Sequence, residues 1–330
     1  MSKFKLAALV LLTLCVSAQA EWPARVFAPY MYIGSGDDFK LTDCDDTCGL
    51  KHYTLAFIIA RQEGRGATTK YLKEPSWEGR IPMDQNLYMD QIRAIRGRGG
   101  DVIMSFGGEA GREIAIVIED DAELEAAYQS IIDRYKFTWL DFDIEGGNLD
   151  RNAKASERRN SVLAKLQQKN RGLRISYTLP VNPDGISKAS QALLADARAK
   201  GVKVYSANLM VMYFGRKFIN KGRSEGELGI DSANAAYAQI QQIDSSIHIG
   251  LCPCLGNNGS RDETFTLDDA KTLKSFADET PWVVSLHYWS INDDSGRPRR
   301  RATTQASTQP TTQPREPWAF ARIFKPFTKD

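Results

Sequence analysis

The sequence predicts an α/β protein with a (β/α)8 (TIM) barrel fold in a single domain. Short β-rich segments recur along the chain, and several are nearly continuous apolar runs, as in strands covered on both faces. Amphipathic, helix-like segments lie between many of them. The candidate strands are residues 26–33, 53–60, 101–108, 137–145, 173–180, 204–214, 247–252 and 282–290.

The segments between the strands have the apolar spacing of helices. The candidate helices are residues 83–98, 122–134, 153–170, 187–200, 232–243 and 267–278. Strand followed by helix, repeated, predicts a parallel sheet, and eight strands in about 300 residues fit a closed barrel. An open doubly wound sheet is the alternative, but no GxGxxG motif follows the first strand. The last barrel helix is predicted from the apolar residues Trp318, Phe320, Ile323, Phe324 and Phe327.

The two unusual segments of the chain are its start and residues 297–315. Lys3 and Lys5 precede an apolar run at residues 6–16 and a small-residue stretch that ends at Ala20. This pattern is typical of a signal peptide, so residues 1–20 are expected to be removed and residues 21–330 to form the exported, secreted barrel domain. Residues 297–315 are rich in Arg, Thr, Gln and Pro, a composition that predicts a flexible loop.

The charge balance excludes some partners. The chain has 43 basic and 41 acidic residues, and loss of Lys3 and Lys5 leaves 41 of each. A neutral protein of this kind is not expected to bind nucleic acid or an anionic membrane. After signal cleavage we expect a monomer without a membrane segment.

Four cysteines remain in the mature chain, namely Cys44, Cys48, Cys252 and Cys254. An even number in an exported protein suggests disulfides, and three pairings are possible. A zinc site is the competing interpretation, but neither pair has C-x-x-C spacing and the histidines are dispersed.

The most informative segment is residues 137–147, which contains Asp141, Asp143 and Glu145. Side chains alternate along a strand, so the three acids share one face, and apolar residues occupy the other. Acids pointing together into a barrel raise one another's pKa, which keeps one protonated as a general acid. Glu145, at the C-terminal end of the strand, is the candidate acid of a glycosidase. A divalent-metal site and a binding protein without catalysis remain alternatives.

The same segment resembles the DxxDxDxE signature of glycoside hydrolase family 18, the chitinases and their relatives. Other stretches resemble family motifs in the right order, so the similarity spans nearly the whole mature chain. They are Ser105-Phe106-Gly107-Gly108, Thr178-Leu179-Pro180, Asn208-Leu209-Met210-Val211-Met212, Cys252-Pro253-Cys254-Leu255-Gly256 and Tyr288-Trp289-Ser290. The resemblance implies a barrel enzyme that acts on chitin or N-acetylglucosamine oligosaccharides without cofactor or metal.

Three positions depart from the family pattern. Thr138 replaces the first Asp of the signature, and Trp139 replaces the Gly that usually follows it. A bacterial chitinase-like branch is similar to this chain in having an aromatic residue directly before LDFDIEG. Where that branch reads Met-x-Met-Asp-Tyr-Gly, this chain has Tyr213 in place of the aspartate. The substitution predicts a slow enzyme, or one adapted to an unusual N-acetylated substrate.

The resemblance also implies roles for individual residues. In the family's substrate-assisted mechanism the 2-acetamido oxygen of the sugar is the nucleophile. Glu145 would protonate the leaving oxygen, Asp143 would hold the acetamide N–H, and Asp141 would share a proton with Asp143. The expected substrate-binding residues are Trp289 as the apolar floor, with Tyr213, Met210, Tyr30 and Phe106 around it.

Two further functions use the same barrel. A chitin-binding or inhibitory protein would have weak or no catalysis, although in such proteins the acid is often replaced and here Glu145 is present. An endo-β-N-acetylglucosaminidase would cut the chitobiose core of N-linked glycans by the same acetamido chemistry.

Overall fold

The computed structural model describes residues 21–33, 39–64, 66–219, 222–258, 263–296 and 316–329. The predicted signal peptide and the predicted loop at residues 297–315 lie outside these ranges. None of the helices in the described ranges has the length and apolar character that crossing a membrane requires.

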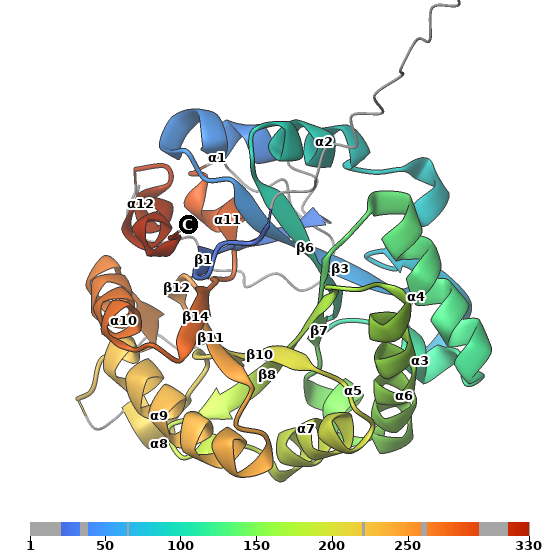
Figure 1. The fold of residues 1–330 in the computed structure, drawn as a ribbon. Helices are drawn as coiled ribbons and strands as arrows, with labels where there is room; N and C mark the ends of the chain where they lie inside the picture. Colours follow the sequence, from blue (N-terminus) through green and yellow to red (C-terminus); the bar gives the residue numbers. More distant parts are fainter. Residues whose placement is uncertain are drawn as a thin grey trace, which may run out of the picture.

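Parallel strands form a ring with helices around it, as the sequence predicts (Figure 1). The strands that follow one another around the ring are β3 (His52–Glu63), β6 (Asp101–Gly107), β7 (Trp139–Asp143), β8 (Arg174–Asn182), β10 (Val204–Met210), β11 (His248–Cys252) and β14 (Val283–Leu286). Each pairs with its neighbour in parallel register.

The predicted first strand closes this ring in two pieces. β1 (Val26–Phe27) pairs with β14, and β2 (Tyr30–Tyr32) pairs with β3. Pro29 lies between them, and a proline has no N–H to donate to a neighbouring strand. Its carbonyl accepts a hydrogen bond from Thr54 N at 2.9 Å, so the segment still connects the first strand to the second.

The outer layer consists mainly of the predicted helices. They are α2 (Met89–Gly97), α4 (Asp121–Tyr135), α6 (Ala153–Lys169), α7 (Lys188–Ala199), α9 (Glu225–Ile243), α10 (Leu267–Glu279) and α12 (Ala319–Phe324). The α9 helix begins earlier than predicted because Ser224 caps it, accepting from Glu227 N while the Glu227 carboxylate accepts from Ser224 N. Such a capping box satisfies N–H groups that have no partner within the helix.

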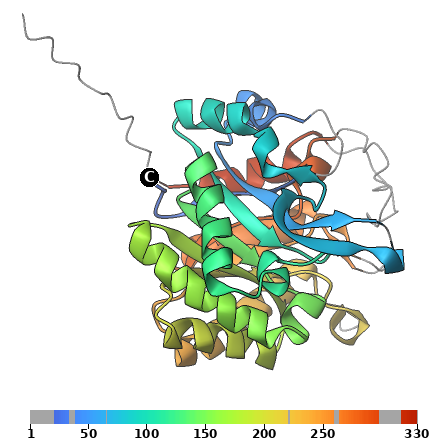
Figure 2. The same cartoon turned by 90° about the vertical axis from the view of Figure 1, so that its right-hand side faces the viewer.

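The sequence patterns missed a hairpin at the second strand. β3 continues beyond the barrel and turns into β4 (Lys70–Trp77), which pairs with it antiparallel and is followed by β5 (Ile81–Pro82). Figure 2 shows this hairpin projecting from the barrel. The remaining short elements are α1 (Leu41–Cys48), η2 (Gly66–Thr68), η3 (Met83–Gln85), α3 (Ile114–Val117), α5 (Gly146–Asp150), β9 (Gly185–Ile186), α8 (Arg216–Ile219), β12 (Gly256–Asn257), β13 (Thr264–Phe265), α11 (Ile291–Asp294) and η4 (Lys325–Phe327).

Trp139 belongs to an aromatic cluster inside the barrel, away from the helix layer. Its ring is fully buried, 5.1 Å from Trp22 and 5.0 Å from Tyr205 between ring centroids. Its indole N–H donates to Ser176 Oγ at 3.0 Å. Trp22 donates to Thr138 Oγ1 at 2.9 Å, so both departures from the family signature lie in this cluster.

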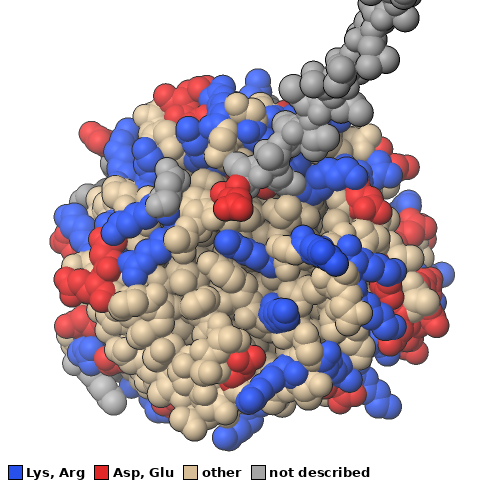
Figure 3. All heavy atoms as spheres, in the orientation of Figure 1, with Lys and Arg blue, Asp and Glu red and all other residues tan. Residues whose placement is uncertain are grey.

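The surface carries both signs of charge. Figure 3 shows basic and acidic side chains interspersed around the rim of the face seen in Figure 1.

The four cysteines are thiols, so the disulfides suggested by their even number are not formed. Cys44 and Cys48 lie one turn apart on α1, with their sulfurs 2.9 Å apart as a thiol hydrogen bond. Cys252 and Cys254 are buried at the end of β11 and just after it.

Candidate active site

The two faces of β7 are used as the alternation of its residues predicts. Leu140, Phe142 and Ile144 are fully buried and belong to the large apolar cluster shared with the helices. Asp141 lies on the opposite face, where its partners come from other barrel strands. The carboxylates therefore point into the barrel, as the sequence predicts.

Asp141 lies at the centre of a hydrogen-bond network of neutral groups. Five side chains donate to its carboxylate at 2.7–3.1 Å: Tyr30, Ser105, Ser176, Thr178 and Asn208. Burial raises the pKa of Asp141, and these hydrogen bonds lower it. Asp141 thus links its own strand β7 to four others, namely β2, β6, β8 and β10.

Asp143 and Glu145 form a hydrogen-bonded pair of carboxyl groups. Burial raises the pKa of both, and the negative charge of Glu145 adds to the rise for Asp143. Glu145 titrates with a pKa of about 7, so the pair retains a proton near neutral pH. From the sequence, we expect Asp141 and Asp143 to share a proton. In the structure Asp143 forms its hydrogen bond with Glu145 instead.

Two glycines of the Ser-Phe-Gly-Gly motif bring the third strand close to this pair. Gly107 has φ +103°, and a Cβ there would lie 2.1 Å from the carbonyl oxygen of Asp143. Gly108 has φ +85°, and a Cβ there would lie 2.7 Å from the ring of Phe57. Both the backbone conformation and the space require glycine.

An aromatic floor lies beside the carboxyl pair. Trp289 stacks on Phe57 with ring centroids 5.5 Å apart and an interplanar angle of 14°. The rings of Tyr30 and Tyr32 pack against the same indole, with ring centroids 5.9 and 5.6 Å from its own. Tyr30 also donates to Asp141, so it connects the floor to the carboxylates. Trp289 and Tyr30 therefore lie together near Asp141, and their role in substrate binding stays a prediction.

Glu78, on the turn after β4, holds two members of the floor. Its Oε1 accepts from Phe57 N at 2.8 Å, and Tyr32 hydrogen bonds to its carboxylate. Burial raises the pKa of Glu78, and these two bonds lower it.

One expectation for the lining needs correction. Phe106 is wrong: it is fully buried in the helix-facing cluster, stacked on Phe142 at 5.1 Å, because its neighbour Ser105 occupies the inward position. Met210 lies on the same strand face as Asn208 and is partly exposed, which suits the barrel mouth. Met212, which is not among the residues predicted to bind substrate, packs against the group that contains Tyr30 and Phe57.

Tyr213 lies at the rim with 53% of its surface exposed. Its hydroxyl is 3.8 Å from Cys254 Sγ, and its backbone has φ +53°. Burial of the hydroxyl and the nearby Cys254 raise the pKa of Tyr213, so it is neutral at physiological pH. The position expected to hold a carboxylate therefore carries no charge.

Sequence reasoning missed several residues of the site. Phe57 was hidden in a continuous apolar run, and Glu109 lies on a loop. Glu109 is nevertheless close enough for its charge, together with burial, to raise the pKa of Glu145. One pattern in the sequence does indicate which side chains face into the barrel: polar residues at alternate positions of otherwise apolar strands. They are Ser105, Ser176, Thr178, Ser206, Asn208, Ser285 and His287.

The chain resembles known proteins over most of its length. It is 30% identical to a probable bifunctional chitinase/lysozyme of Escherichia coli (strain K12), over 93% of this chain and 35% of that protein. It is 30% identical to endochitinase 11 of Metarhizium anisopliae, over 83% of this chain and 53% of that protein. The chain thus spans between a third and about half of the length of these curated relatives. No protein-family model matches it.

Solved structures agree with the sequence relatives. The catalytic domain of a hyperthermophilic chitinase from Pyrococcus furiosus is 28% identical, with a TM-score of 0.77 over 94% of this chain and 96% of that one. A family 18 chitinase from Chromobacterium violaceum, 14% identical, shares the fold with a TM-score of 0.56 over 94% and 83% of the two chains. By sequence and by structure, this chain is similar to chitinases, and it shares the fold of a family 18 chitinase.

Proposed function

We propose that this protein hydrolyses β-1,4 linkages between N-acetylglucosamine units of chitin by substrate-assisted, retaining catalysis. The observation that carries the proposal is the hydrogen-bonded pair Asp143–Glu145 on the inner face of β7, with a raised pKa beside an aromatic floor. We also place the chain in the bacterial branch that carries an aromatic residue before LDFDIEG, on the basis of residues 139–146.

The geometry suggests how each group acts. The apolar face of the reacting sugar would stack on Trp289, which leaves its 2-acetamido group near Asp143. Among the described residues, Asp143 Oδ1 is buried and has no hydrogen-bond partner, so it can accept the acetamido N–H. Taking up that N–H favours the ionised form of Asp143, and the shared proton then belongs to Glu145.

Bond cleavage follows from this arrangement. Glu145 gives its proton to the glycosidic oxygen as the acetamido oxygen attacks the anomeric carbon, forming an oxazolinium ion and releasing the leaving sugar. Asp143, now negative, stabilises the positive ring. Glu145, now ionised, takes a proton from water as the water opens the ring, and the product keeps the original configuration.

The test of this function is the dependence of cleavage on the acetamido group. Chitotetraose should be hydrolysed, whereas the fully deacetylated tetramer and cellotetraose should not, since neither has the internal nucleophile. Product analysis by mass spectrometry measures all three. Cleavage of cellotetraose at a comparable rate would contradict the mechanism and point to a two-carboxylate glycosidase.

Tyr213→Asp tests the charge missing from the rim. A carboxylate here would stabilise the positive charge that develops on the substrate, and because Tyr213 is half exposed we expect kcat on chitotetraose to rise by about tenfold. Tyr213→Asn, similar in size to aspartate but neutral, is the control and should give no rise. Loss of activity in both variants would show that the phenol itself has a catalytic duty.

A further inference from the structure

A polar cavity of about 340 Å³ adjoins the turn that follows Glu145. Its lining comes from three places: Tyr71 on the β3–β4 hairpin, the loop after β6 with Glu109 and Arg112, and the α5–α6 segment with Gly147 and Arg151. None of the floor aromatics lines it. The cavity is therefore distinct from the aromatic floor around Trp289, and it adjoins Glu145 through the residues that follow it in the chain.

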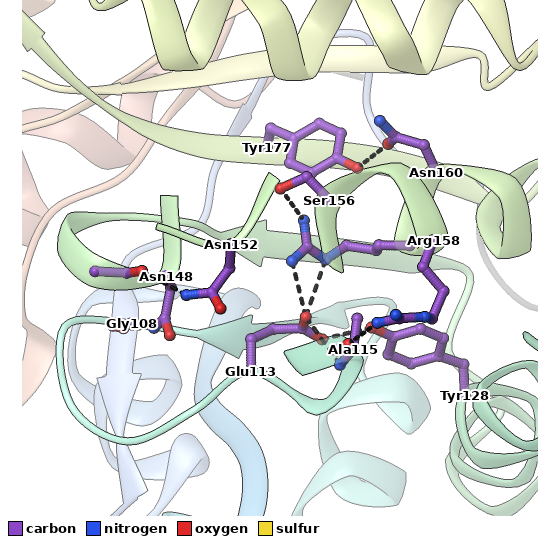
Figure 4. A network of polar contacts seen from close by, with 12 residues as sticks. Gly108, Glu113, Ala115, Tyr128, Asn148, Asn152, Ser156, Arg158, Asn160 and Tyr177 are labelled. Atoms are coloured by element: carbon purple, nitrogen blue, oxygen red, sulfur yellow. Dashed lines mark hydrogen bonds and ion pairs between the residues drawn. The ribbon is translucent and has the colours of Figure 1, made fainter. Parts of the chain in front are cut away.

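Two asparagines that line this cavity form hydrogen bonds to the backbone beside it. Asn148 Nδ2 donates to the carbonyl of Gly108 at 3.1 Å, and Asn152 Nδ2 donates to that of Gly147 at 2.6 Å (Figure 4). Gly147 also makes room for Arg151, because a Cβ at this position would lie 2.3 Å from the guanidinium. The turn after Glu145 thus packs directly against the guanidinium of Arg151.

The charges that line the cavity are unbalanced. The Arg112 guanidinium lies over the ring of Tyr71, 4.6 Å from its centroid. In the part of the chain that the structure describes, neither Arg112 nor Arg151 forms an ion pair, whereas other arginines such as Arg96 and Arg159 pair with carboxylates. Glu109 is the one acid among the lining residues, so two positive groups outnumber one negative group.

The position of the cavity indicates which half of a substrate reaches it. This step rests on the proposed function, in which Trp289 and Asp143 hold the sugar that is attacked. The leaving sugar is joined to that sugar through the oxygen that Glu145 protonates, and Glu109, which lines the cavity, is close enough for its charge to act on Glu145. We propose that this cavity binds a carboxylate carried by the leaving, reducing-end half of the oligosaccharide.

Two kinds of aminosugar chain carry such a carboxylate. One is chitin oxidised at its reducing end to an aldonic acid, and the other is a chain in which alternate sugars bear a 3-O-lactyl group. Guanidinium groups bind carboxylates with charge-assisted hydrogen bonds in both cases.

Binding to the Glu145→Gln variant tests the proposal without any need for turnover. Calorimetry at low salt would compare chitotetraose, its aldonic acid and the lactyl-substituted tetrasaccharide. We expect at least one acidic sugar to bind about tenfold more tightly than chitotetraose. The one that does so identifies the source of the carboxylate.

Substitutions locate the effect. Arg112→Gln with Arg151→Gln should remove the preference for the acidic sugar, while retained binding of chitotetraose shows that the variant is folded. Arg171→Gln, an exposed arginine after α6, is the matched control and should keep the preference. Glu109→Gln should strengthen it, because a repelling charge is removed.

Equal affinity for acidic and neutral sugars would overturn the inference, as would a preference that survives loss of both arginines. Failure of the proposed function has a different signature, namely no cleavage of chitotetraose by the unmodified protein. If none of the three sugars binds, both the proposed function and the carboxylate site are wrong.

Discussion

Replacing Glu145 by glutamine is expected to reduce hydrolysis of chitotetraose at least ~10²-fold, the contribution of one general acid. The amide has the shape of the acid but cannot give a proton to the leaving oxygen. Binding of chitotetraose should be largely kept, because the floor around Trp289 is unchanged. Turnover and binding are measured on the same preparation. Unchanged turnover would refute the assignment of Glu145.

Glu279→Gln is the matched control, since it removes an exposed carboxylate at the end of α10, away from β7. It should leave turnover as it is.

The pH dependence of kcat/KM of the unmodified protein is a second test of the role of Glu145. Hydrolysis needs this group protonated, and its pKa is about 7, so kcat/KM should fall as the pH rises through about 7. Burial and the charge of Glu109 both raise this pKa, so Glu109→Gln should move the fall to lower pH. A profile that is flat to pH 9 would contradict the assignment of the acid.

Much of the barrel and the centre of its site could be predicted because one residue pattern determines both. In β7, apolar and acidic residues alternate, and only one face of the strand can meet the helices, so Asp141, Asp143 and Glu145 had to face inward. The alternating polar residues of the other strands then supply the donors for Asp141.

The alternation of residues does not show which side chains face inward where both faces of a strand are buried. All seven residues of β6 are buried, so the sequence does not show whether Ser105 or Phe106 faces inward, and Phe106 was assigned to the wrong side. Phe57 lies in a run of nine buried residues and was missed for the same reason. Glu109 and Glu78 lie on turns, whose course depends on tertiary contacts that no local pattern records.

Behind β7, the strand that carries Asp141 and Asp143, lies a buried ion pair that no sequence pattern indicated. Arg159 on α6 donates through Nε and Nη2 to Glu113 at 3.0 and 2.9 Å, and both side chains are fully buried. Tyr128 also donates to Glu113, and its ring contacts Phe142 on the outer face of β7. Phe142 lies between Asp141 and Asp143, so this network supports the strand that carries the acids.

Glu113→Gln is therefore expected to lower the free energy of unfolding by about 3–5 kcal/mol, because it leaves the Arg159 charge buried without a counterion. Urea denaturation followed by circular dichroism measures the change. The double variant Glu113→Gln, Arg159→Met should recover most of the loss, since it removes the stranded charge as well. Glu74→Gln is the control, because its pair with Arg61 is exposed and should contribute no more than about 1 kcal/mol. If the single and double variants are equally destabilised, loss of packing rather than an unpaired charge is the cause.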